Sequence, residues 1–181
     1  MKKKSGEKPH IVHQKTIVIP IFEQYLRKED ANMENYLYGN RVHKLDAKGR
    51  IAIPAHMRGR LGEEFIASLG LGDFIALYPQ DQWEELLNKV QSSTLSTEKK
   101  KKLSLYLISS ADKMTLDSQG RLLISDRLKE KVSLLGEKEA VVFGNINHIE
   151  IWNSALFNEQ VASIEKQEVI NIMDELNGIG I

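Results

Sequence analysis

Residues 45–53 read Leu45-Asp46-Ala47-Lys48-Gly49-Arg50-Ile51-Ala52-Ile53, and the pattern returns as Leu116-Asp117-Ser118-Gln119-Gly120-Arg121-Leu122-Leu123-Ile124. Both stretches contain Asp-x-x-Gly-Arg followed by a short apolar run. The match continues downstream, where Gly70 corresponds to Gly144 and Trp83 to Phe157. A match of this length and order indicates an internal repeat with copies over residues 39–89 and 109–160, and it suggests a pseudo-symmetric fold built from both copies.

The Asp-x-x-Gly-Arg pattern is typical of a tight hairpin turn. Asp accepts backbone hydrogen bonds in such a turn, and a glycine three residues later supplies the positive φ of a three-residue loop with a bulge. We therefore assign a loop-structuring role to the repeated Asp and Gly residues: Asp46, Gly49, Asp117 and Gly120. A short helix is predicted after each motif, because Pro54 suits a first helical position and Ser125 suits an N-cap.

The rest of each copy predicts a pair of strands and a helix. The strand pairs are predicted at residues 65–69 with 74–78 and at 140–143 with 148–152, and a helix begins near Pro79 or Asn153. Each copy is therefore expected to be a β-α-β-β-α unit, in a mainly β fold with capping helices (α+β).

The predicted organisation of the chain has five parts. They are an N-terminal extension over residues 1–36, a first repeat over 37–90, a connecting loop and helix over 91–108, a second repeat over 109–160, and a C-terminal helical tail over 161–181. The extension is expected to be disordered or not native, with Met33 as the hypothetical natural start.

Composition excludes several classes of protein. The 181 residues contain no cysteine, which excludes a disulfide framework, a thiolate zinc site and a cysteine nucleophile. No apolar run approaches the roughly 20 residues of a membrane span, so we expect a cytoplasmic protein with no membrane partner. No phosphate-binding glycine loop or nucleophile elbow occurs, and we expect no enzymatic activity, no cofactor, no metal and no small-molecule substrate.

The net charge of zero conceals blocks of opposite sign. Between residues 41 and 60, six cations face a single acid, Asp46, whereas residues 139–181 are mostly acidic. The cations are Arg41, Lys44, Lys48, Arg50, Arg58 and Arg60. Nucleic-acid-binding domains are usually basic overall, so the net charge of zero argues against DNA binding. The uneven distribution of charge along the chain instead suggests an interaction face. An ordinary solvated surface remains an alternative at this point.

The paired motifs resemble those of the MraZ family, bacterial regulators encoded at the head of the division and cell-wall gene cluster. The matching pieces are Leu45–Pro54, Leu77-Tyr78-Pro79 with Trp83, Leu116–Arg121 and Ile149–Trp152. The resemblance implies an AbrB-like swapped-hairpin double-split β-barrel and a ring-like homo-oligomer. It also implies binding to short direct repeats in a double-stranded promoter at the nucleoid, and repression of the protein's own operon. The chain departs from the family pattern at Ser125, where Pro is common, and at Lys129, where Arg is common.

The two loops carry side chains that suit DNA. A two-stranded ribbon fits the major groove, where Arg contacts guanine bidentately and Lys contacts phosphate. Gln119 could bind adenine or phosphate. The candidate DNA-binding residues are Lys48, Arg50, Gln119, Arg121, Arg41 and Lys44, with Arg58 and Arg60 nearby in sequence. On the resemblance, Asp fixes the loop and Arg faces DNA.

Several other interpretations are open. Each Asp–Arg pair could be an ion pair that only braces its turn. The two repeated aspartates could be an acid–base pair, and His10-x-x-His13 could bind a metal, although no third ligand lies nearby. The same barrel could also be an antitoxin-like or scaffolding module that binds protein.

Overall fold

The computed structural model describes residues 36–178, which lie within the larger of two units of the chain, Glu34–Ile181. The predictions made for residues 1–35, including the Met33 start and the His10/His13 pair, lie outside the described residues. Within the described part, no helix is both long and apolar enough to span a membrane.

Two sets of elements follow one another in the same order. The first repeat contains β1 (Leu37–Lys44), β2 (Arg50–Ala52), α2 (Ala55–Leu61), β3 (Glu64–Leu69), β4 (Phe74–Pro79) and α3 (Gln80–Ser92). After α4 (Thr97–Ser109), the second repeat contains β5 (Asp112–Thr115), β6 (Arg121–Leu123), α5 (Asp126–Lys131), β7 (Glu139–Ile146), β8 (His148–Trp152) and α6 (Ser154–Ala162), and α7 (Lys166–Gly178) follows. The predicted mixed α+β class and tandem repeat are confirmed.

The predicted β-α-β-β-α order is wrong at the start of each repeat, where two strands precede the first helix. The segments before and after each Asp-x-x-Gly-Arg turn are separate strands, β1 and β2 in the first repeat and β5 and β6 in the second, because the chain reverses direction at the turn. In the first repeat, the isolated bridge between Leu45 and Ile51 and the hydrogen bond from the Asp46 N–H to the Arg50 carbonyl, at 2.9 Å, join the two sides of the turn. Beyond that bridge, β1 and β2 pair with strands of the second repeat and not with each other. The expected local hairpin therefore extends no further than the turn.

Strand pairing interleaves the two repeats. A six-stranded sheet has the order β1-β7-β8-β4-β3-β5, and β2 pairs with β6 in a separate two-stranded sheet. All of these pairs are antiparallel. Thus β1 of the first repeat pairs with β7 of the second, while β5 of the second pairs with β3 of the first. The first two strands of each repeat therefore take their partners from the other repeat, while β3–β4 and β7–β8 pair within one repeat, and closure into a barrel stays a prediction.

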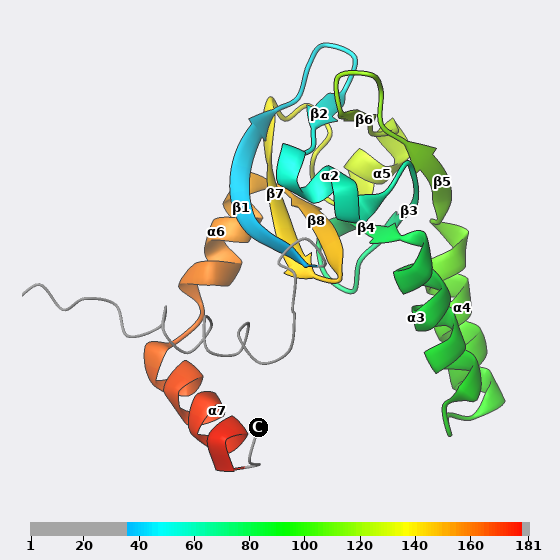
Figure 1. Cartoon of the computed structure of the whole chain (residues 1–181), viewed down its shortest axis with the longest axis vertical. Coiled ribbons are helices and arrows are strands. Elements are labelled where there is room, and N and C mark those ends of the chain that lie inside the picture. Colours follow the sequence, from blue (N-terminus) through cyan, green and yellow to red (C-terminus); the bar gives the residue numbers. More distant parts are fainter. Residues whose placement is uncertain (1–35, 179–181) are drawn as a thin grey trace, which may run out of the picture. The chain divides into compact units, whose positions relative to one another are not determined.

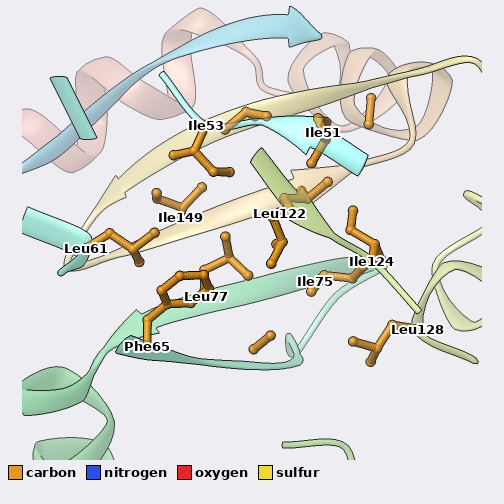
Figure 2. Packing of buried hydrophobic residues seen from close by; sticks show 14 of the residues in the cluster. Ile51, Ile53, Leu61, Phe65, Ile75, Leu77, Leu122, Ile124, Leu128 and Ile149 are labelled. Atoms are coloured by element: carbon orange, nitrogen blue, oxygen red, sulfur yellow. The ribbon is translucent and has the colours of Figure 1, made fainter. Parts of the chain in front are cut away.

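The apolar residues that follow each motif form the centre of the core. Ile51 and Ile53 are completely buried, and Leu122 and Ile124 are nearly so. Alternate residues of a strand point to the same face, and Figure 2 shows these side chains directed toward Ile75, Leu77 and Ile149 of the larger sheet. Burial of each such side chain contributes about 1.5–3 kcal/mol. The core therefore anchors the C-terminal side of both motif loops.

Candidate nucleic-acid interface

The first loop, residues 45–49, is shaped by Asp46. One carboxylate oxygen, Oδ1, accepts the backbone N–H groups of Lys48 at 2.9 Å and Arg50 at 3.0 Å. The backbone of Asp46 also accepts from Gly49 at 2.8 Å and donates to Arg50 at 2.9 Å. Gly49 has φ +76°, a conformation that side chains disfavour. The local sequence thus closes the loop with its own polar groups.

The second loop, residues 116–120, has the same construction. Asp117 Oδ1 accepts the backbone N–H groups of Gln119 at 3.0 Å and Arg121 at 2.9 Å. Gly120 donates to the Asp117 carbonyl at 2.8 Å and has φ +74°. The sequence repeat is therefore also a repeat of atomic contacts.

The two motif arginines are bound by the two motif aspartates. Arg50 Nε lies 2.7 Å from Asp46 Oδ2, and Arg121 Nη2 lies 2.8 Å from Asp117 Oδ2. Each arginine also approaches the aspartate of the other repeat, at 3.6 Å in both cases. The arginine side chains remain 27% and 26% exposed. The ion pairs that could brace the turns are thus present, and the guanidinium groups are still partly open to solvent.

These contacts favour the ionised carboxylates. Hydrogen bonds from the Arg121 side chain and then its backbone N–H hold the pKa of Asp117 at about 2. The backbone N–H of Arg50 is the largest cause of a lowered pKa at Asp46. Both aspartates therefore carry negative charge near neutral pH, and they balance the two arginines.

Backbone hydrogen bonds join the loops across the repeats. The Ile53 N–H donates to the Gly120 carbonyl at 3.0 Å, and the Ile124 N–H donates to the Gly49 carbonyl at 3.2 Å. Together with the pairing of β2 and β6, these bonds place the two loops side by side at one end of the fold (Figure 1).

Exposed polar side chains surround this end of the molecule, mainly on the first repeat. Lys48 and Gln119 are exposed in the two loops, and Arg41 and Lys44 are exposed on β1. Among residues 36–178, no carboxylate forms an ion pair with Arg41, Lys44 or Lys48. The first repeat therefore supplies exposed cations near the loops, of which Lys44 has Glu139 directly opposite it on β7.

The two cations of α2 have different surroundings. Arg58 Nε donates to the Ile53 carbonyl at 2.7 Å, and its guanidinium lies against Gly120. Arg60 instead binds both carboxylate oxygens of Asp81, at 3.0 and 2.8 Å. The Arg60 side chain is the largest cause of the lowered pKa of Asp81, about 2. Arg58 therefore frames the loops, whereas Arg60 holds α2 to α3.

Sequence reasoning did not place Lys129 at the site. This residue of α5 corresponds to Arg58 in the repeat, and its ammonium lies 2.6 Å from the ideal Cβ position of Gly49. The repeat register was the signal that could have identified it. As for metal ligands, the described residues contain no cluster of three or more His, Asp or Glu side chains able to hold an ion.

Comparison with known proteins agrees with this architecture. The family model described as "MraZ protein, putative antitoxin-like" matches residues 37–105 and again 107–177. The transcriptional regulator MraZ of Halothermothrix orenii is 34% identical over 140 residues, which cover 76% of this chain and 96% of the relative. The protein of the same name from Thermoanaerobacter pseudethanolicus is 30% identical over 143 residues, 78% of this chain and 99% of the relative.

A third relative shows slightly higher identity over a shorter stretch. The transcriptional regulator MraZ of Desulfitobacterium hafniense (strain DSM 10664 / DCB-2) is 36% identical over 119 residues, 66% of this chain and 82% of the relative. These relatives are named as regulators and not as enzymes, in agreement with the expected absence of enzymatic activity. On the repeated match and the nearly full coverage of its relatives, the chain belongs to the MraZ family.

Proposed function

We propose that this chain is a sequence-specific DNA-binding transcriptional regulator that represses its own division and cell-wall operon. The observation that carries the proposal is the pair of equivalent loops held together at one end of the fold, with exposed Lys48 and Gln119. The relatives' name, transcriptional regulator, supports it. The protein would act in the cytoplasm at the nucleoid, without a cofactor or a small-molecule substrate.

The ion pairs with aspartate are compatible with a role for the arginines in reading DNA. A guanidinium has five N–H donors in a fixed plane. Arg50 directs Nε to Asp46, and its Nη1 is 3.6 Å from the nearest oxygen of Asp117, which leaves donors for another acceptor. The Asp residue thus orients the guanidinium, and the remaining N–H groups of Arg50 and Arg121 contact guanine O6 and N7 in the major groove.

The other loop and strand residues have complementary roles. Lys48, Arg41 and Lys44 contact phosphates, which adds affinity and salt dependence without sequence information. Gln119 occupies the position equivalent to Lys48, and its amide suits the N6 and N7 atoms of adenine. The two loops therefore present different chemistry to the duplex.

Assembly completes the proposal. The exchange of strands between the repeats supports an AbrB-like swapped-hairpin double-split β-barrel. Copies of this barrel form a ring-like homo-oligomer, which presents several identical loop pairs to short direct repeats in promoter DNA. Linked contacts of this kind raise affinity by factors of about 10²–10⁴ over a single contact.

A gel-shift titration with the DNA upstream of the protein's own gene tests this function. We expect binding to that fragment and much weaker binding to a fragment of equal length and composition in shuffled order. Equal binding to both fragments would contradict sequence-specific regulation.

An antitoxin-like or scaffolding module is the second candidate, and the description of the matching family model favours it. Such a module predicts no preference for the upstream fragment in the same titration. It predicts instead that a protein partner binds through the same barrel.

A further inference from the structure

We infer that Arg58 and Lys129 are positioning residues, each holding the motif loop of the opposite repeat, so that the two loops form one DNA-reading unit. The claim that the loops read DNA rests on the proposed function. The positioning itself stands on contacts within the chain.

Arg58 connects the first repeat to the second loop. Its Nε donates to the Ile53 carbonyl at 2.7 Å, while the N–H of the same Ile53 donates to the Gly120 carbonyl at 3.0 Å. The guanidinium of Arg58 occupies the space that a Cβ at Gly120 would need. One residue, Ile53, therefore fixes both the cation and the loop on which that cation lies.

Lys129 makes the equivalent connection in the other direction. Its ammonium fills the space beside Gly49, and its side chain is only 12% exposed. Asp126 holds the ammonium at 2.7 Å, and the nearby Ile124 N–H donates to the Gly49 carbonyl at 3.2 Å. The first loop thus lies against a cation of the second repeat, as the second loop lies against a cation of the first.

This arrangement gives the two motif glycines a second structural role beside their positive φ. Each adopts a positive φ, and each also leaves the space that the opposite cation occupies. A side chain at either position would displace a cation of the other repeat. Each loop is therefore held in place by a side chain of the opposite repeat.

The two connections differ in charge. Lys129 is neutralised by Asp126, whereas among residues 36–178 the guanidinium of Arg58 has the Ile53 carbonyl as its hydrogen-bond partner and forms no ion pair with a carboxylate. Gln119 makes the tip of the second loop neutral, so Arg58 supplies the positive charge beside that loop. Each loop therefore has one cation that forms no ion pair with a carboxylate of residues 36–178. This cation is Lys48 within the first loop, and it is Arg58 of the first repeat beside the second loop.

Hydrogen exchange of the full chain without DNA tests the positioning directly. Lys129→Met removes the ammonium and keeps an unbranched stem, and we expect several-fold faster exchange of the amides of residues 48–50 with little change at 119–121. Arg58→Met should give the reverse pattern. Lys131→Met, an exposed position on the same helix as Lys129, is the matched control and should change neither loop.

Faster exchange only in the variant's own repeat, equal changes in both loops, or no change at all would overturn the inference. Unchanged protection in β7 and β8 verifies that each variant is folded. Asp126→Asn provides a milder second test, because Asp126 is exposed and holds Lys129 without contacting the loop. It should also speed exchange at residues 48–50, and wild-type exchange there would count against the role of Lys129.

DNA titrations separate the inference from the proposed function. If the wild type binds its upstream fragment, Arg58→Met and Lys129→Met should weaken that binding at least several-fold, and Lys131→Met should not. Wild-type affinity in the first two variants would overturn the claim that the loops read DNA as a unit. Failure of the wild type to bind DNA would refute the proposed function, and the crossed exchange pattern would still show whether each loop is held by the opposite repeat.

Discussion

Arg50 Nη1 of the first repeat lies 3.6 Å from Asp117 Oδ2 of the second, and Arg121 Nη1 lies at the same distance from Asp46 Oδ2. The contacts inside each repeat are shorter, at 2.7 and 2.8 Å. Positive and negative groups thus alternate around the junction of the two loops. Each arginine is oriented by its own aspartate and attracted by the other, so the junction depends on both copies of the motif.

Replacement of Arg50 by Ala is expected to abolish specific binding to the promoter while preserving the fold and the assembly. The side chain is partly exposed, and its loss removes guanine contacts worth about 1–3 kcal/mol for each bidentate pair. It also removes the arginine that balances Asp46, whereas Asp117 keeps its ion pair with Arg121. Titration against specific and shuffled fragments, with light scattering for assembly, measures both effects.

Arg127→Ala is the matched control for this variant. Arg127 forms an ion pair with Asp112 at 2.9 Å and is exposed, but it lies outside the loops. Its removal should leave specific binding intact. If Arg50→Ala instead loses assembly, the ion pairs are structural and the assignment of Arg50 to DNA contact is wrong.

Lys48→Ala is expected to weaken binding to every sequence by a similar factor. Lys48 is exposed and forms no ion pair with a carboxylate of residues 36–178. Such a lysine suits phosphate contact, which releases counterions and carries no sequence information. The slope of log affinity against log salt should fall in magnitude by about 1 for each loop that contacts DNA. The exposed Lys101 of α4 is the control, and Lys101→Ala should keep the wild-type slope. A sequence-dependent loss would instead place Lys48 against a base.

The loops were predictable because their determinants are local. Asp46 Oδ1 accepts backbone N–H groups two and four residues away, and Gly49 adopts the positive φ that the turn requires. The core residues that follow each motif were equally predictable from the sequence, since their alternating burial follows the apolar pattern. The N-cap at Ser125 is confirmed by its hydrogen bond from the Leu128 N–H at 3.4 Å. Pro54, however, precedes α2 as its N-cap residue and is not its first helical residue.

The exchange of strands could not be derived from local pattern. In β1 only Leu37 is buried and His43 half-buried, so alternation defines no buried face there, and the choice of β7 as its partner depends on residues far away in the chain. The surroundings of Arg58 and Arg60 are another example. Residues two apart on a helix do not share a face, so one cation reaches the Gly120 loop and the other reaches Asp81. Arg58 and Arg60 look alike in the sequence, and only the packing of α2 shows that they have different partners.

Protonation of Asp117 at low pH is expected to weaken the hydrogen bonds that close the second loop. The pKa of Asp117 is about 2 in the folded chain, below the value of about 3.9 for an unperturbed aspartate. A depressed pKa contributes stability that is present above about pH 4 and is lost as the pH falls toward 2. The backbone amide shifts of Gln119 and Arg121 should therefore titrate with a midpoint near 2. A midpoint near 3.9 would show that the arginine does not hold the carboxylate.

The adjacent residues Leu122 and Leu123 offer a test of the core beneath the loops. Leu122 is 1% exposed and Leu123 is 54% exposed, so the two positions share chemistry and differ in burial. Leu122→Ala should lower the free energy of unfolding by about 2–5 kcal/mol, and Leu123→Ala should change it by no more than about 0.5 kcal/mol. Denaturant titration measures both values. A larger cost for Leu123→Ala would mean that β6 presents the opposite face to the core, and equal costs would contradict the difference in burial.

The spacing of the direct repeats should control affinity if a ring engages several of them at once. An insertion of about 5 base pairs between two repeats turns the second by half a helical turn, and an insertion of about 10 restores its direction. Binding to the half-turn fragment should approach that of a single repeat, a loss of up to about 10²–10⁴-fold. The full-turn fragment should recover part of that loss, because its repeats face the same side. A protein that binds each repeat independently would show no difference among these fragments, and that result would refute the multivalent ring.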